Sequence, residues 1–214
     1  DRGEGEWSDI LRLIPYDRLA AVEYAHRWAF GRNPAYYNFD ALGGDCTNFV
    51  SQCVLAGSCT MNFTRDFGWY YISSSDRAPA WAGVEYFYDF MTGKPEFAME
   101  NGGTGPFAEQ VRRRFSMIGD VIQLGDENGD YYHTLLISKI EEDEIFVCAH
   151  TNDALDRPLS SYNYSVERFL HIKGVREQVP DDSCFGALIN GTALPVIPPK
   201  SDESIGEDNP DNSD

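Results

Sequence analysis

The spacing of apolar residues changes partway along this chain of 214 residues, and the change limits the folds open to it. Up to about residue 115, apolar residues recur at three- and four-residue intervals, which predicts amphipathic helices. These helices are expected over about 18–29, from Cys46 to near Gly57, over about 82–92 and over about 107–115.

From residue 120 onward, short apolar runs alternate with turn residues, a pattern typical of antiparallel strands. The strands are expected over about 120–124, 133–140, 145–150 and 168–173. Because the helices come first and the sheet second, the chain is predicted to belong to the α+β class, with N-terminal helices packed on an antiparallel sheet.

Composition suggests three parts of unequal size. Residues 1–15 are expected to form an N-terminal extension, and residues 16–178 to form one domain with a sizeable core. Residues 179–214 are rich in Pro, Asp, Ser and Asn, and eight Asp or Glu residues face one Lys between positions 181 and 214. A segment of this kind has little to bury, so it is expected to be a flexible acidic tail.

The formal net charge of −18 argues against a nucleic-acid partner, which needs a basic surface. No run of 18 apolar residues occurs, so no membrane span is expected. The chain begins with Asp rather than Met, so we expect a processed or trimmed chain. We expect a monomer.

Cys46 follows two glycines and Asp45 and opens a helical pattern. A thiol at a helix N-terminus lies in the positive potential of unpaired N–H groups, which favours the nucleophilic thiolate. Asp45 itself could bind a substrate amine or cap the helix, and these two interpretations weigh equally. The spacing of the five cysteines includes no Cys-x-x-Cys pair, so no structural zinc site is expected.

A cysteine nucleophile needs a base and a group that orients the base. Of the four histidines, His26 and His171 are expected to be structural, whereas His133 begins a strand just after a polar turn. A hairpin turning at residues 142–143 would place His133 opposite residues 150–152. Either His150 or Asn152 could then orient the His133 ring, and the residues alone do not choose between them.

Several stretches together resemble papain-like amidases and peptidases, including NlpC/P60 and CHAP domains, and most closely the amidase domain family named amidase_6. The stretches are 16–25 with Trp28 and 33–36, then 44–53, and then 119–123, 132–134 and 149–153. They span about residues 16–175, and Gly44–Cys53 is the most specific among them. Gly43 stands where members of the family more often carry a polar residue.

The resemblance implies a papain-like, NlpC/P60-type fold and a cysteine hydrolase that needs no metal or cofactor. Its substrate would be a peptide or a peptidoglycan stem peptide, and its location would be secreted or in the cell envelope. Cys46 would be the nucleophile and His133 the base, with His150 ranked before Asn152 as the orienting group and Asp153 as a further option. Tyr37, Trp69 and Asp45 are the expected substrate-binding residues, although the aromatic residues could equally belong to the core.

Three other interpretations remain open. The fold could be an inactive module that binds a cell-wall or protein ligand, or it could transfer acyl groups to an amine rather than to water. A metal site built from Cys46, His133 and His150 is the weakest of the three.

Overall fold

The computed structural model describes residues 11–93, 103–177 and 184–194. Its helices are α1 (Arg18–Trp28), α2 (Cys46–Ser58), α3 (Pro79–Ala82), α4 (Val84–Thr92) and α6 (Cys184–Ile189), with short 3-10 helices η1 (Asp40–Leu42), η2 (Arg113–Phe115) and η3 (Leu159–Ser161). Its strands are β1 (Arg12–Ile14), β2 (Gly105–Val111), β3 (Val121–Gly125), β4 (Tyr131–Glu141), β5 (Glu144–Ala149), β6 (Ala154–Pro158) and β7 (Val166–Glu177).

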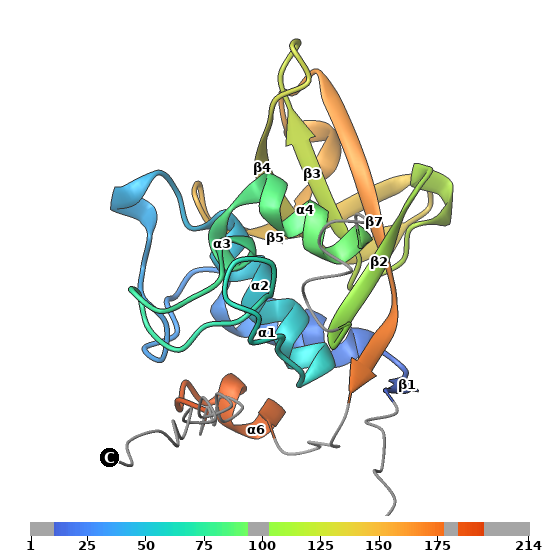
Figure 1. Ribbon diagram of the computed structural model, residues 1–214. Coiled ribbons are helices and arrows are strands. Elements are labelled where there is room, and N and C mark those ends of the chain that lie inside the picture. The colour runs from blue at the N-terminus through green and yellow to red at the C-terminus, as the bar shows by residue number, and fades with distance from the viewer. Residues whose placement is uncertain (1–10, 94–102, 178–183, 195–214) are drawn as a thin grey trace, which may run out of the picture.

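The strands form one antiparallel sheet of seven strands in the order β1-β7-β3-β4-β5-β6, and β2 pairs with β7 as well. Figure 1 shows the helices gathered on one side of this sheet, with α2 among the other helices. The expected α+β class, with helices packed on an antiparallel sheet, is therefore confirmed.

Alternate residues of the sheet enter two separate apolar clusters. On β4, Leu136 joins the cluster formed with the helices, whereas Leu135 and Ile137 join a second cluster between β3, β5 and η3. This division follows from the two-residue period of a strand, which sends successive side chains to opposite faces. It also determines on which face each site residue of β4 lies.

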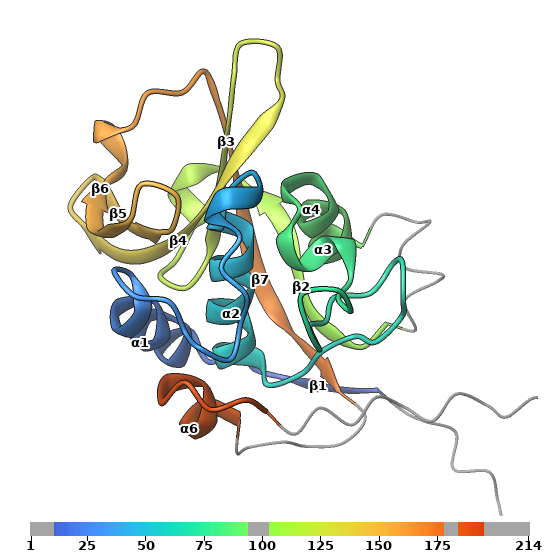
Figure 2. The same cartoon turned by 90° about the vertical axis from the view of Figure 1, so that its left-hand side faces the viewer.

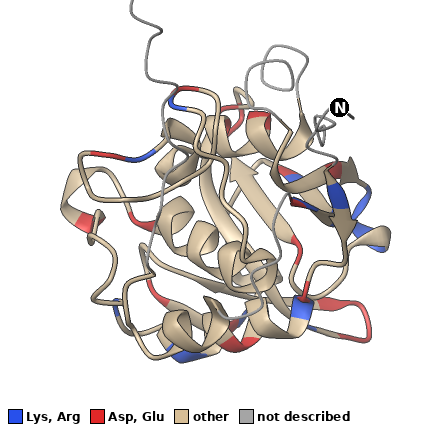
Figure 3. Ribbon diagram, turned by 60° about the horizontal axis from the view of Figure 1, so that its bottom comes forward, with Lys and Arg blue, Asp and Glu red and all other residues tan. Residues whose placement is uncertain are grey.

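Helix α2 is buried along its whole length, and not along a single stripe as its apolar spacing suggested. It contacts α1, α3, α6 and the strands β2, β4 and β5, so no side of it faces solvent. No charged residue occurs in Cys46–Ser58, and Figure 3 shows the charged residues mainly around the periphery of the ribbon. The polar side chains of the helix must therefore find partners inside the protein.

Three such partners are aromatic. The Trp81 indole donates to Asn48 Oδ1 at 2.8 Å, and the Trp69 indole donates to Ser51 Oγ at 3.0 Å. The Tyr24 hydroxyl donates to Gln52 Oε1 at 2.7 Å. These bonds fix the rotation of α2 about its own axis, which determines where its first residue points.

The prediction of a helix over residues 107–115 was wrong. This segment contains strand β2 and the short η2, and β2 pairs with β7 from Gly105↔Arg176 to Val111↔Phe169. The Arg176 guanidinium also lies 3.7 Å from the centre of the Phe107 ring. The hydrogen bonds of an otherwise open edge of β7 outweigh the weak helical spacing of so short a segment.

The described structure extends beyond both expected domain boundaries. Strand β1 lies within the expected N-terminal extension and pairs with the end of β7. Helix α6 lies within the expected tail, and Figure 2 shows it beneath α1 and α2. A disulfide between Cys59 and Cys184 joins α6 to the end of α2. Cys184 and Leu188 are also buried in the apolar cluster formed with the helices. Residues 179–183 and 195–214 of the expected tail lie outside the described residues.

Among the described residues, no helix combines the length and apolar character that crossing a membrane would require.

Candidate active site around Cys46

The turn before Cys46 depends on two glycines with left-handed backbones, Gly43 at φ 106° and Gly44 at φ 121°. Side chains rarely adopt these angles. Gly44 also lies close to the turn after β5, because a Cβ built on it would lie 3.2 Å from Thr151 Oγ1. The same Thr151 hydroxyl accepts a hydrogen bond from the Asp45 backbone N–H at 2.8 Å. The turn after β5 therefore positions the start of α2.

The Asp45 side chain is 1% exposed and makes contacts in three directions. Its Oδ1 accepts from the Phe39 backbone N–H at 2.9 Å and from the Asn48 amide at 2.8 Å. Its Oδ2 lies 2.6 Å from His150 Nδ1 and 3.6 Å from Arg32 Nε. Asp45 neither faces a substrate nor caps a backbone N–H of α2, so both interpretations of its role need correction.

His150 is held away from the orienting role that was ranked first for it. Its Nε2 donates to the Trp28 carbonyl at 2.9 Å, because a carbonyl can only accept, and its Nδ1 forms a hydrogen bond with Asp45 Oδ2 at 2.6 Å. Its ring stacks on Phe49 with centroids 3.9 Å apart. Both nitrogens are thus engaged, and His150 connects α1, α2 and β5 rather than orienting His133.

Cys46 is the first residue of α2 and its side chain is 7% exposed. Its thiol interacts with the Thr134 backbone, and the neighbouring Thr47 hydroxyl bonds Thr134 Oγ1 at 2.9 Å. Burial raises the Cys46 pKa above its ordinary value of 9.0, and the hydrogen bonds from Thr134 and Thr47 only partly oppose this. Burial and the nearby Asp45 charge thus oppose the thiolate that the helix N-terminus was expected to favour.

His133 comes directly before Thr134 on β4, but its side chain lies on the face of the strand away from α2. It shares a face with Leu135 and Ile137, while Thr134 faces α2. Its ring centroid lies 6.0 Å from that of Tyr162. Burial, together with the nearby positive charge of Arg157, lowers the His133 pKa from 6.5 to about 4.

The structure therefore brings Cys46 to the peptide unit that joins His133 and Thr134, but no hydrogen bond links the two side chains in the described part of the chain. Both groups are neutral at pH 7, because one pKa is raised and the other is lowered. A neutral imidazole can take a proton from a neutral thiol as the thiol attacks, and hydrogen bonds of this kind often shorten only when substrate binds.

The two other candidates for the group that orients His133, Asn152 and Asp153, form no hydrogen bond with it among the described residues. Asn152 is exposed in the turn after β5, with a left-handed backbone at φ 68°. Asp153 instead binds the Arg32 guanidinium, at 2.9 and 3.1 Å. The groups that do surround His133 are Tyr162 and Arg157, which sequence reasoning missed because β6 and η3 carry no distinctive motif.

The expected aromatic substrate contacts divide into exposed and buried residues. Tyr37 is 45% exposed, and its backbone carbonyl accepts from the Asn48 amide, so its ring can meet a ligand. Trp69 is fully buried in the helix-side core, and Tyr70 is also buried. The assignment of Trp69 to a binding cleft was therefore wrong, because its indole supports α2 instead.

Backbone donors at the start of α2 are available for a developing oxyanion. The first backbone bond of the helix runs from the Phe49 N–H to the Asp45 carbonyl at 2.9 Å, so the N–H of Cys46 precedes the helical ladder. By contrast, N–H groups of the loop before Gly43 bond within the protein, as Tyr37 does to Tyr71 and Phe39 to Asp45.

The lowered pKa of His133 predicts a loss of stability in mild acid. The unfolded chain binds a proton near pH 6.5 that the folded chain accepts only near pH 4, so stability is complete above pH 6.5 and falls as the pH drops toward 4. The expected loss is on the order of 3 kcal/mol in the free energy of unfolding. Urea denaturation at several pH values should show this loss in the wild type and a smaller one in His133→Gln. If His133→Gln retains the full pH dependence, the loss comes from other groups.

Comparisons with known proteins give one family and one relative. A family model described as "Putative amidase domain" matches residues 15–172. The chain is similar to a protein of Bacillus subtilis (strain 168) named "Uncharacterized protein YhbB", with 32% identity over 156 residues. The match covers 71% of this chain and 46% of that protein, so the chain spans about half the length of this relative. No solved structure matches.

Proposed function

The chain belongs to the family described as "Putative amidase domain", and from this premise we propose that it hydrolyses an amide bond with Cys46 as nucleophile and His133 as general base. The observation that carries this proposal is the packing of the start of α2 on β4, where the Thr47 hydroxyl bonds Thr134 Oγ1 at 2.9 Å, one residue after His133. We also propose that the arrangement is papain-like, since a buried helix begins with the nucleophile and packs on the strand that carries the base.

The neutral resting state determines the order of proton transfers in this proposal. In this proposal the His133 ring, which rests on the Tyr162 side of β4, turns toward Cys46 when substrate binds. It accepts the thiol proton as Cys46 Sγ attacks the carbonyl carbon, and the Cys46 N–H stabilises the oxyanion. The carbon–nitrogen bond then breaks, the amine leaves with the proton from His133, and a thioester remains on Cys46. Water attacks the thioester after giving a proton to His133, and the acid product leaves as the thiol regains its proton.

The proposed substrate class is a peptide or a peptidoglycan stem peptide. The exposed ring of Tyr37, on the loop that packs against the start of α2, offers an apolar contact for such a chain. Nearby Asp40 and Asp153 both bind Arg32, so this surface carries paired charges rather than a free anionic site.

The proposed location is secreted or in the cell envelope. The Cys59–Cys184 disulfide supports this location, because such bonds persist in oxidising compartments and are rare in a reducing cytosol.

Acyl-enzyme trapping tests the proposal directly. The full chain would be incubated with a small activated ester and with mixtures of peptides and of peptidoglycan fragments, and intact-mass and product-mass spectra would be recorded. We expect one acyl group on Cys46, and product pairs whose masses sum to the substrate plus one water. An adduct that persists in Cys46→Ala, or no product from any of the mixtures, would contradict the proposal. A matched control is Cys53→Ala, which alters a buried thiol of the same helix.

An inactive binding module is the second candidate, and the lack of a hydrogen bond between Cys46 and His133 favours it. Binding of peptidoglycan or peptide by both the wild type and Cys46→Ala, with no product from either, would support this alternative. Capture of an added amine in the product would instead indicate acyl transfer.

A further inference from the structure

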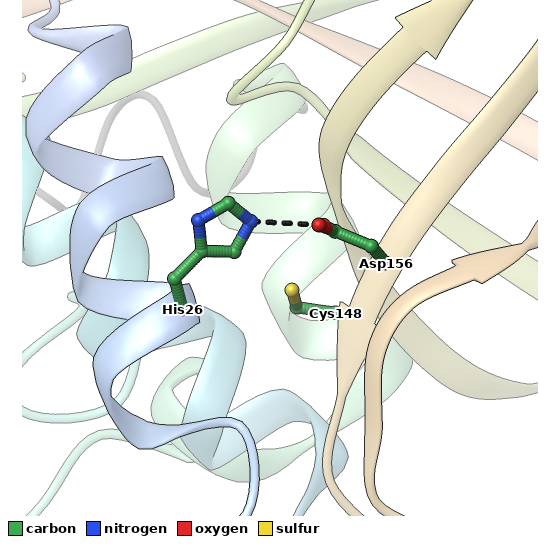
Figure 4. Close-up of side chains that lie close together, drawn as sticks. All are labelled: His26, Cys148 and Asp156. Carbon is green, nitrogen blue, oxygen red and sulfur yellow. Dashed lines mark hydrogen bonds and ion pairs between the residues drawn. The ribbon is translucent and has the colours of Figure 1, made fainter.

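Three potential metal ligands from three different elements converge beside helix α1. They are His26 of α1, Cys148 of β5 and Asp156 of β6, and one ligand atom from each lies within 4.8 Å of the others. Figure 4 shows the three side chains pointing toward a common centre, with a hydrogen bond from the His26 ring to Asp156. The three residues are far apart in the sequence, so only the fold brings them together.

We propose that His26, Cys148 and Asp156 bind a divalent transition-metal ion of the Zn²⁺ class. Imidazole, thiolate and carboxylate are the three ligand types that Zn²⁺ takes in proteins, and three protein ligands leave a fourth position for water. Binding replaces the thiol proton of Cys148, so that one metal–sulfur bond forms and one proton is released to solvent. The proposed metal site is separate from the proposed active site and includes neither Cys46 nor His133.

The distances suit such an ion after a small adjustment. In a tetrahedral site with metal–ligand bonds near 2.0–2.3 Å, ligand atoms lie roughly 3.3–3.6 Å apart. His26 Nε2 and Asp156 Oδ1 now lie 2.8 Å apart, so they must separate slightly. Their side chains are 42% and 38% exposed and can move, whereas Cys148 is fully buried and fixes one corner of the site.

The side chains around the three ligands include one polar group, Ser138, and one positive charge, Lys139. The Ser138 hydroxyl donates to the Phe146 carbonyl at 3.2 Å and lies near both the Cys148 thiol and the Asp156 carboxylate, so it stands where a supporting group of a metal site would stand. Lys139 lies near Asp156, but its ammonium pairs with Glu141 at 2.6 Å. The positive charge of Lys139 is therefore already paired with an acidic side chain.

A bound ion would join the edge of the sheet to a helix. Strand β6 is the last strand in the sheet order, and in it Asp156 has a left-handed backbone at φ 47°. Arg157 follows Asp156 and influences His133, so an ion that holds β6 against α1 would also hold the surroundings of His133.

Metal titration of the full chain tests the proposal without an activity assay. Protein purified with a chelator and then dialysed would be titrated with Zn²⁺ by calorimetry and with Co²⁺ by absorption spectroscopy. We expect one ion per chain and a cobalt–thiolate charge-transfer band in the near ultraviolet. Cys148→Ala should abolish the band, and His26→Gln and Asp156→Asn should each weaken Zn²⁺ binding at least tenfold.

The controls distinguish this site from other thiols. Cys46→Ala and Cys53→Ala should leave the band and the affinity unchanged, and circular dichroism would show that each variant is folded. His26→Gln is the variant least able to disturb the fold, since its side chain is largely exposed. Binding that survives His26→Gln and Cys148→Ala, a band lost only in Cys46→Ala, or no binding by the wild type would overturn the proposal.

Discussion

Replacing Cys46 with alanine is expected to reduce kcat/KM for the amide substrate at least about 10³-fold, because the thioester of the proposed mechanism forms on its thiol. The His133→Ala variant should lose about 10²–10⁴-fold, the usual contribution of a general base. Because the pKa of His133 is about 4, kcat/KM of the wild type should stay high down to mildly acidic pH and fall only as the pH approaches 4. Steady-state rates across pH would measure all three effects.

The matched variant Cys53→Ala separates chemistry from packing. Cys53 is a fully buried free thiol two turns along the same helix, so its loss tests whether any change to α2 lowers the rate. We expect Cys53→Ala to retain its rate within a few-fold. Equal losses in the two variants would mean that Cys46 acts only in packing.

Replacing Asp45 with alanine is expected to lower the free energy of unfolding by about 3–5 kcal/mol. The substitution would leave the donors of Phe39, Asn48 and His150 without their acceptor inside a site that is almost closed to water. Unpaired buried donors keep their full desolvation cost, which explains the size of the effect. Urea denaturation at pH 7 would measure the loss.

Asp40→Ala provides the control for that measurement. Asp40 also binds Arg32, at 2.7 Å, but 37% of its side chain is exposed, so its pair is screened by water. We expect it to cost no more than about 1 kcal/mol. If Asp45→Ala is as mild as Asp40→Ala, the Asp45 contacts do not stabilise the fold, and another element must hold the start of α2.

Local pattern was enough to predict the long, regular elements. Asp17 caps α1 by accepting from the Ala20 N–H, and the strong apolar runs of β3, β4 and β5 each became a strand. Weak segments were decided by their neighbours instead. Residues 105–111 became a strand because β7 offered an unpaired edge, and residues 184–189 became part of the domain because Cys59 and a core were available to them.

The site shows the same division at the scale of single residues. The Gly–Gly–Asp–Cys turn, its helix and the strand that begins near His133 can all be predicted from nearest neighbours along the chain, because helix starts and strand runs are local. The partner of His150 could not be predicted in this way, because Asp45 lies 105 residues away along the chain and only the packing of β5 on α2 brings them together.

By itself, the sequence determined the α+β class, the position of Cys46 at a helix start and the strand that carries His133. Only the tertiary structure decided that Cys46 is a buried neutral thiol, that His133 faces Tyr162 and Arg157, and that His150 supports Asp45. The reason is that hydrogen-bond and apolar periodicities act over a few residues, whereas desolvation and charge depend on every segment that packs around a group.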